Sequence, residues 1–367
     1  MKFTIEKPIL QEAISNAQKA ITGKTTMPVL QGIFIKAKNN ELTVIGSDID
    51  LTIETKIEAQ VEEEGEIVVD SRLFGEIIRK LPNAPVNIES MENDTINIQC
   101  LKSIATLVHM NPGEYPNLPQ INENMIFTIP QGILKNMIKS TIFAIAQDET
   151  RPILTGILFE IKDNRINLVA LDGYRVALRK ENIDSLSSIN AVIPGKTLNE
   201  ISKILEDGEN PTEITFTPNH ILFNLGNTRV ISRLLEGQFI KYESIIPKEY
   251  NLKVMVKRGE ILNSIERASL MGKEGKTNLV KLDIQEEAMV ITSNSQLGKA
   301  REEVNIILQG EPLKIAFNSK YLIDVFKIMD EEEVVMEFSS SISPCVIKNK
   351  DNDKCSYLLL PVRLVNN

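Results

Sequence analysis

The sequence predicts an α+β protein built from three tandem repeats, each of which combines amphipathic helices with antiparallel sheet. Two patterns support this prediction: distant segments resemble each other at a constant offset, and helical and strand periodicity alternate within each repeat. The chain has 367 residues, 42% of them hydrophobic, which is enough to bury several cores. Helices packed on strands that are apolar on one face define the α+β class.

The repeat is clearest between MPVLQGIFIKAKNNELTVIGSD, which starts at Met27, and RPILTGILFEIKDNRINLVALD, which starts at Arg151. The offset of 124 residues that separates Pro28 from Pro152 also aligns Leu30 with Leu154, Gly32 with Gly156, Ile33 with Ile157, Lys38 with Lys162, Asn40 with Asn164 and Asp48 with Asp172. A fainter third copy, which needs a small gap, places Ser319 at twice that distance after Ser71.

Loop-like clusters of Gly, Pro, Asn and Glu separate the copies. They predict boundaries near Met125 and Pro247, and therefore domains 1–124, 125–247 and 248–367.

Each repeat is expected to open with a strand, such as Met1–Glu6, and to continue with a helix. Four apolar residues at helical spacing predict the buried face of the first helix: Leu10, Ile14, Ala17 and Ile21. Alternating residues predict half-buried antiparallel strands at Leu42–Val44 and Ile166–Leu168. A second helix and closing strands complete the repeat, with helices expected at Arg72–Leu81, Lys196–Leu205 and Lys320–Met329, and strands at Ile96–Cys100 and Ile214–Phe216.

Cysteine usage and hydropathy exclude several classes of protein. The three cysteines, Cys100, Cys345 and Cys355, form neither a CxxC motif nor a cluster with histidine, so no disulfide framework, zinc site or other cofactor is predicted. A reducing cytoplasm is the expected location. The N-terminus resembles a strand rather than a signal peptide, and no apolar run approaches the roughly 18 residues of a membrane span.

The motifs that carry enzyme chemistry are missing from the sequence. His109 and His220 fall in strand-like segments of different copies, without a nearby acid or nucleophile pattern. The tripeptides that start at Gly23 and Gly275 resemble the tail of a P-loop but lack the frame GxxxxGK(S/T). The acidic pairs Asp48/Asp50 and Glu302/Glu303 follow no metal-binding pattern. A non-enzymatic protein is therefore predicted, with an enzyme whose site is scattered through the fold as an alternative.

Charge is separated between helices and the rest of the chain. The net charge is −9, yet the six predicted helices sum to +6, which leaves −15 elsewhere. In each copy the second helix carries two cations seven residues apart, on one face: Arg72/Arg79, Lys196/Lys203 and Lys320/Lys327. One interpretation is a solvated face with i,i+4 ion pairs to Glu76, Glu200 and Asp324. The other is a positive surface for sequence-independent phosphate contacts, since stacking aromatics are missing.

Several motifs together resemble the bacterial sliding clamps, the β subunits of DNA polymerase III. They are the opening MKFTIEK, the segment KTTMPVLQGIFI, the segments QDETRPILTGILFEI and LVALDGYRVA, and the final YLLLPVRL. The resemblance covers the whole chain. It implies the DNA clamp fold and a head-to-tail homodimer, in which six domains form a ring with helices inside and sheets outside. Such a ring encircles duplex DNA and tethers the polymerase without catalysing a reaction.

The resemblance also implies a cleft for partner peptides between the second and third copies. Its expected partners are the polymerase α subunit, the clamp-loader δ subunit and repair factors, which bind through short linear motifs. The matching positions are Leu154, Leu171, Gly173, Tyr174, Arg175, Val176, Ile240, Ser244, Ile245, Pro247, Leu358, Leu359, Leu360, Pro361, Val362 and Arg363. The family usually has Thr at 171, His at 174, Pro at 240 and often Arg at 244, so a more apolar cleft is expected.

DNA contacts and the dimer seam are assigned by the same resemblance. Candidate DNA-binding residues are Lys24, Arg72, Lys80, Gln147, Lys196 and Lys203. The expected seam pairs the strand around Lys102 and Leu107 with Leu270, Met271, Glu302 and Glu303 of the other chain. The alternative hypothesis, from a different functional class, is an adaptor protein that binds peptides and never encircles DNA.

Overall fold

The computed structural model describes residues 1–23, 25–117, 119, 121, 126–185, 188–274 and 278–363. They form two compact units, Met1–Ile133 with Lys196–Leu234 (unit 1) and Leu134–Gly195 with Leu235–Asn367 (unit 2). Each unit therefore combines parts of more than one predicted domain. The predicted boundary at Met125 lies outside the described residues, and the division into three domains stays a prediction.

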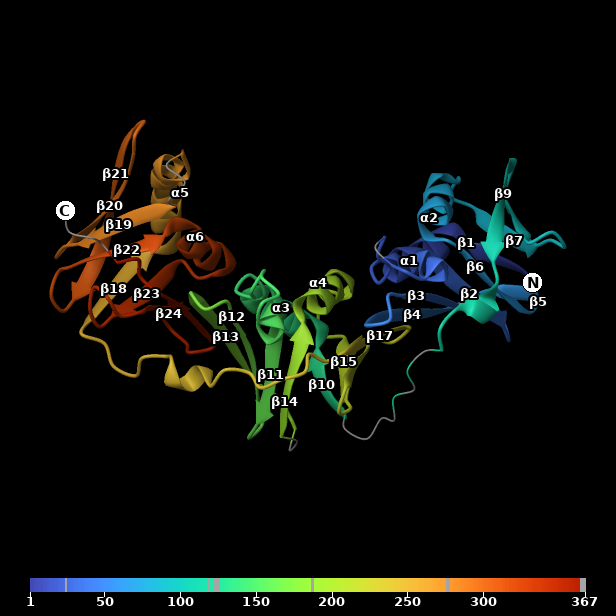
Figure 1. The fold of residues 1–367 in the computed structure, drawn as a ribbon, viewed down its shortest axis with the longest axis horizontal. Coiled ribbons are helices and arrows are strands. Elements are labelled where there is room, and N and C mark those ends of the chain that lie inside the picture. Colours follow the sequence, from blue (N-terminus) through green and yellow to red (C-terminus); the bar gives the residue numbers. More distant parts are fainter. Residues whose placement is uncertain are drawn as a thin grey trace. The chain divides into compact units, whose positions relative to one another are not determined.

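Unit 1 contains one antiparallel sheet in the order β10-β15-β16-β17-β4-β3-β2-β6-β9-β8-β7-β1-β5 (Figure 1). Its strands are β1 (Lys2–Glu6), β2 (Gly32–Lys38), β3 (Glu41–Ser47), β4 (Leu51–Glu58), β5 (Gln60–Glu63), β6 (Gly65–Asp70), β7 (Pro85–Ser90), β8 (Thr95–Cys100), β9 (Ser103–Met110), β10 (Ile126–Pro130), β15 (Pro211–Phe216), β16 (His220–Asn224) and β17 (Thr228–Arg233). The pairing of β17 with β4, for example Val230 opposite Ile53, makes the sheet continuous.

Helices α1 (Lys7–Gln18) and α2 (Ser71–Lys80) pack together on the sheet of unit 1. A proline in the first turn starts α1, where its missing N–H costs nothing. Asp70 caps α2 by accepting a hydrogen bond from Leu73 N at 2.7 Å. Gly46 allows β3 to approach α1, since a Cβ there would lie 2.0 Å from the backbone oxygen of Ala17. Short 3₁₀ turns lie at Pro28–Gln31 (η1) and Pro112–Glu114 (η2).

Unit 2 contains the second antiparallel sheet, in the order β14-β11-β12-β13-β25-β24-β23-β18-β21-β20-β19-β22. Its strands are β11 (Gly156–Lys162), β12 (Arg165–Leu171), β13 (Arg175–Asn182), β14 (Ile189–Pro194), β18 (Leu252–Lys257), β19 (Leu279–Ile284), β20 (Ala288–Ser295), β21 (Gly298–Gln309), β22 (Leu313–Asn318), β23 (Glu333–Phe338), β24 (Cys345–Asn349) and β25 (Cys355–Leu359). The last strand, β25, pairs with β13, with Leu358 opposite Val176. This pairing joins the second and third predicted domains.

Helices α5 (Arg258–Glu274) and α6 (Ser319–Ile328) pack against each other in unit 2. Asn318 caps α6 through a bond from Lys320 N at 3.0 Å. Two more helices are α3 (Gln131–Ile142) and α4 (Gly195–Ile204), and 3₁₀ turns lie at Pro152–Thr155 (η3) and Tyr242–Ser244 (η4).

The predicted α+β class with antiparallel sheets is confirmed. The second helix of each copy begins and ends one residue earlier than predicted, and Ile21 lies beyond α1, although it still packs on the core. All three cysteines are buried and free. Among the described residues, no helix is long and apolar enough to cross a membrane, and no group of three potential metal ligands occurs.

Candidate partner-binding site

The structure brings four of the predicted cleft residues into one apolar cluster in unit 2. Leu154 of η3, Leu171 of β12, Val176 of β13 and Leu358 of β25 are each at most 5% exposed and pack together. Phe239, Tyr242 and Val346 also belong to this cluster, together with Leu158, Val169, Leu178 and Val192 of the sheet. The sequence pattern missed Phe239, Tyr242 and Val346 because nothing in it links residues so far apart in the chain.

Five other apolar side chains of the same prediction stay exposed to solvent. The exposed fractions are 61% for Tyr174, 37% for Ile240, 36% for Ile245, 37% for Leu360 and 42% for Val362. Leu360 N donates to Tyr174 O at 2.9 Å, so the two residues lie side by side. Exposed apolar residues gathered around an apolar cluster are typical of docking surfaces.

A tight turn presents Tyr174. Asp172 Oδ1 accepts hydrogen bonds from Tyr174 N at 2.9 Å and from Arg175 N at 3.1 Å. Gly173 has φ +92°, a conformation that glycine adopts without a steric penalty. The Asp-Gly pair thus explains why the chain reverses here and turns the tyrosine outward.

Arg175 is only 7% exposed and connects several elements. Its Nε donates to Asp172 Oδ2 at 2.9 Å, its Nη1 to Asp324 Oδ2 at 2.7 Å, and its Nη2 to Phe143 O at 2.5 Å. With its donors occupied in this way, Arg175 supports the site rather than offering a free charge to a partner.

Aromatic rings enclose the Arg175 guanidinium. Its central carbon lies 4.5 Å from the ring centroid of Tyr321 and 5.3 Å from that of Phe143. Tyr321 also stacks on Tyr174, with centroids 6.3 Å apart. Burial, followed by the charge of Asp172, raises the pKa of Tyr321. Tyr321, Phe143 and Asp324 belong to the candidate site although no sequence pattern pointed to them there.

A linker segment, residues 237–247, supplies the remaining predicted residues. Phe239 and Tyr242 are buried, whereas Ile240, Ser244 and Ile245 are exposed. Ser244 Oγ donates to Lys241 O at 2.7 Å, within the linker itself. Pro247 is half-buried and follows η4.

One buried leucine of the predicted cleft is not part of the apolar cluster. Leu359 is 1% exposed and lies on the face of β25 opposite Leu358, because successive strand side chains alternate. Pro361 and Arg363 follow the end of this strand, half-buried and exposed respectively.

The predicted DNA-binding residues differ in their surroundings. Arg72 and Lys80 are exposed on α2, and Gln147 is exposed in unit 2. In unit 1, Lys196 pairs with Asp48 and Lys203 with Glu200. Lys24 lies outside the described residues.

The alternative of i,i+4 ion pairs on the second helices is wrong for α4 and α6. Among the described residues, Glu200 bonds Lys203 at i,i+3, and Asp324 bonds Arg175 instead of a cation of its own helix. Lys327 pairs with Glu266 of α5 at 2.8 Å. Lys203 thus finds its partner within α4 at a shorter spacing, whereas Asp324 and Lys327 of α6 find theirs on other elements.

The predicted seam residues lie on two separate units. Lys102 is exposed beside β9, while half-buried Leu107 packs against the core of unit 1. Ile104 and Val108, which alternate with it on β9, are 67% and 74% exposed. On unit 2, Leu270 is 55% exposed and Met271 is half-buried. Within the chain, Glu302 bonds Arg267 and Glu303 bonds Arg301.

Comparisons with known proteins agree along the whole chain. Family models for the N-terminal, central and C-terminal domains of the DNA polymerase III beta subunit match residues 1–119, 128–241 and 243–363. The beta sliding clamps of Halalkalibacterium halodurans and Bacillus subtilis are each 38% identical to it, over 99% of this chain and 100% of theirs.

Solved structures give the same result. The DNA polymerase sliding clamp from Bacillus subtilis is 38% identical and matches with a TM-score of 0.97 over 100% of both chains. A sliding clamp from Pseudomonas aeruginosa bound to griselimycin is 26% identical and matches with a TM-score of 0.95, over 99% of this chain and 100% of that one. The chain therefore belongs to the DNA polymerase III beta subunit family, the beta sliding clamps, which are processivity factors and not enzymes.

Proposed function

We propose that two copies of this chain close head to tail into a ring that encircles duplex DNA and tethers the replicative polymerase. The observation that carries the proposal is the match of three consecutive clamp domains over nearly the entire chain. A ring holds DNA by topology, so its contacts with the duplex need only be weak and independent of sequence. Tethering raises the effective concentration of polymerase at the primer end.

The charged faces of the helices supply the DNA contacts in this proposal. Arg72, Lys80, Lys196 and Lys203, together with Lys24 and Gln147, are the proposed contact residues. The chain carries a net charge of −9, whereas the α2 residues Arg72, Arg79 and Lys80 form a local basic face. Cations restricted to helices would attract the duplex there while the acidic remainder repels DNA elsewhere.

The seam is proposed to join the β9 region, with Lys102 and Leu107, to Leu270, Met271, Glu302 and Glu303 of the other copy. The exposure of Ile104, Val108 and Leu270 supports an interface at these two places, since large apolar side chains there gain from burial. The division into domains 1–124, 125–247 and 248–367 belongs to this proposal, as does a location in the cytoplasm.

The cleft residues are proposed to bind short, largely apolar peptides of the polymerase α subunit, the clamp-loader δ subunit and repair factors. Support comes from the buried apolar cluster and from the exposure of Tyr174, Ile240, Ile245 and Leu360, which are near neighbours of its members in the chain. We further propose that griselimycin, which is bound to the related Pseudomonas aeruginosa clamp, occupies the same residues here. It therefore serves as a probe of the cleft.

Retention on DNA of different topology tests the proposal. The chain is loaded onto nicked circular DNA by its clamp loader, and the fraction bound is measured by gel filtration before and after one restriction cut. A ring should remain on the circle and slide off the linear product. Equal loss from circular and linear DNA would contradict encirclement and favour a peptide-binding adaptor.

A further inference from the structure

Tyr242, a residue of the linker 237–247, makes a buried hydrogen bond to the sheet of unit 2. It is 4% exposed, and its hydroxyl donates to Glu160 Oε2 at 2.5 Å. Asn167 Nδ2 donates to the same oxygen at 2.8 Å and also approaches the tyrosine hydroxyl at 3.3 Å. Glu160 and Asn167 face each other across β11 and β12. Burial, and then the bond to Glu160, raise the pKa of Tyr242, so the hydroxyl keeps its proton and remains a donor.

This contact is the linker's main polar attachment. Among the described residues, the hydrogen bonds of Tyr242 are the only ones that join residues 237–247 to the sheet. The other bonds of the segment, such as Ile245 N to Tyr242 O at 3.0 Å, stay within it. The apolar packing of Phe239 buries surface, but apolar contacts are not directional and favour no single orientation of the segment. The Tyr242 hydroxyl is therefore the directional link between the segment and the sheet, beside the apolar packing of Phe239 and Tyr242.

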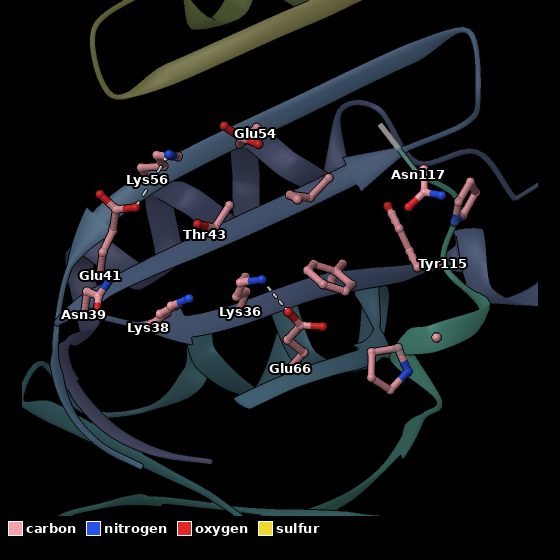
Figure 2. Close-up of a pocket in the computed structure, with 15 residues that line it drawn as sticks. Lys36, Lys38, Asn39, Glu41, Thr43, Glu54, Lys56, Glu66, Tyr115 and Asn117 are labelled. Carbon is pink, nitrogen blue, oxygen red and sulfur yellow. Dashed lines mark hydrogen bonds and ion pairs between the residues drawn. The ribbon is translucent and has the colours of Figure 1, made fainter. Parts of the chain in front are cut away.

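The first copy of the repeat lacks these groups. At the 124-residue offset, Lys36 stands where the second copy has Glu160, and the sequence has Leu118 in place of Tyr242. Lys36 Nζ instead donates to Glu66 Oε1 at 2.5 Å, along a cavity of about 760 Å³ that Tyr115 also lines. Figure 2 shows these side chains. The corresponding cavity in unit 2, about 570 Å³, is lined by Glu160 and Tyr242. The contact thus has no counterpart in the first copy, where the residue at the position of Glu160 is a lysine with a different partner.

We propose that the Tyr242–Glu160 hydrogen bond positions the linker and thereby sets the affinity of the predicted cleft. This inference rests on the proposed function of the cleft. Tyr242 packs in the same cluster as Leu154 and Leu358, while its linker neighbours Ile240 and Ile245 face outward. Holding the tyrosine ring by its hydroxyl therefore fixes both the cluster and the exposed isoleucines. A segment held in its binding conformation loses less entropy when a ligand binds.

Losing the hydroxyl should weaken binding by populating linker conformations that cannot bind. When only a fraction of molecules is competent, the apparent Kd rises by the inverse of that fraction. For Tyr242→Phe we expect the Kd for griselimycin, measured by isothermal titration calorimetry, to rise by about tenfold. Backbone amides of residues 237–247 should exchange with deuterium faster in the free variant, while those of the sheet strands keep the wild-type rate.

Variants of Glu160 separate positioning from general damage. Glu160→Gln keeps an acceptor oxygen and should retain most of the affinity, whereas Glu160→Met removes the acceptor and should match Tyr242→Phe. The double variant Tyr242→Phe/Glu160→Met should bind no more weakly than either single one, because both remove the same bond. The matched control is Lys36→Met, which breaks the ion pair at the same repeat position in unit 1 and should leave the Kd unchanged.

The outcomes distinguish this inference from the proposed function. If the wild-type chain binds griselimycin and Tyr242→Phe binds it with the same Kd, the positioning role is overturned and the cleft assignment stands. Equal weakening by Lys36→Met would also overturn it, because the effect would then be general. Failure of the wild-type chain to bind griselimycin, or unchanged binding after Leu360→Ser, would overturn the cleft assignment and the inference with it.

Discussion

Arg175 Nη1 donates to Asp324 Oδ2 at 2.7 Å and so joins β13 of the second predicted domain to α6 of the third. The two residues are 149 positions apart in the chain. The arginine is 7% exposed, and its other bonds, to Asp172 and to Phe143 O, hold it in one orientation. A charge network at this place links the two sides of the candidate site and explains why an arginine is buried there.

Removing this network should destabilise the protein. Arg175→Met leaves Asp172 and Asp324 without their cation, and we expect the free energy of unfolding to fall by about 3 kcal/mol. Urea denaturation, monitored by circular dichroism, measures this change in the free energy of unfolding. Arg179→Met is a comparison that removes a different partly buried arginine of β13, bonded to Glu181. Wild-type stability of Arg175→Met would show that the network contributes nothing.

Neighbouring leucines of β25 and the segment after it should behave differently. Leu359 is 1% exposed, so Leu359→Ala should cost about 2–4 kcal/mol of stability. Leu360 is 37% exposed, so Leu360→Ser should change stability by no more than about 0.5 kcal/mol. Griselimycin binding should weaken in Leu360→Ser, which remains fully folded. Equal stability losses for the two variants would contradict their assigned surroundings.

DNA binding should depend on the exposed cations of α2. The double variant Arg72→Ala/Lys80→Ala should bind a short duplex more weakly. The slope of log Kd against log salt concentration should fall by about 1–2, because fewer phosphates are neutralised in the complex. Fluorescence anisotropy at salt concentrations between about 50 and 200 mM measures this slope. Lys38→Ala, which removes an exposed lysine of the cavity in Figure 2, should leave the slope unchanged.

Acid should weaken the ion pair between α5 and β21. Arg267 donates to Glu302 at 3.0 Å through Nε, and this hydrogen bond lowers the pKa of Glu302. The folded state therefore binds fewer protons than the unfolded chain. The stabilisation that the Arg267–Glu302 ion pair gives to the folded state is fully present above the ordinary carboxyl pKa of about 4.3. It is lost as the pH falls through the lowered pKa of Glu302 in the folded state.

The Glu302→Gln variant should show this dependence directly. It should be less stable than the wild type at neutral pH, and the difference should shrink toward zero in acid. Urea denaturation at a series of pH values gives the comparison. A stability difference between wild type and variant that stays constant with pH would contradict the link between protonation of Glu302 and unfolding. A difference that grows in acid would mean that the pKa of Glu302 is raised, not lowered, in the folded state.

Periodicity in the sequence predicted most of the local structure. The spacing of the apolar residues Leu10, Ile14 and Ala17 follows directly from helix geometry. The alternation of apolar and polar residues in β3 and β12 follows from the geometry of a half-buried strand. The apolar members of the candidate site could be predicted only through the resemblance to a family. Local pattern alone does not distinguish Leu358, inside the cluster, from Leu359, outside it.

The contacts that organise the site could not be predicted in this way. Arg175 reaches Phe143 over 32 positions, and Tyr242 reaches Glu160 over 82. In each pair only one residue lies on a strand, Arg175 on β13 and Glu160 on β11, and the tertiary fold brings the other segment to it. No local rule specifies which side chains then face each other. The i,i+4 pair predicted on α6 failed for the same reason, since Asp324 bonds the guanidinium of Arg175, outside its helix.

The pairing of β25 with β13 has a consequence for the order in which the chain folds. Until residues 355–359 pair with it, β13 is an edge strand with unpaired backbone groups. Leu358 is missing from its cluster in the same state. A folding intermediate with β25 detached therefore has no finished place for a partner to dock, and binding competence arrives only when these two distant strands have met.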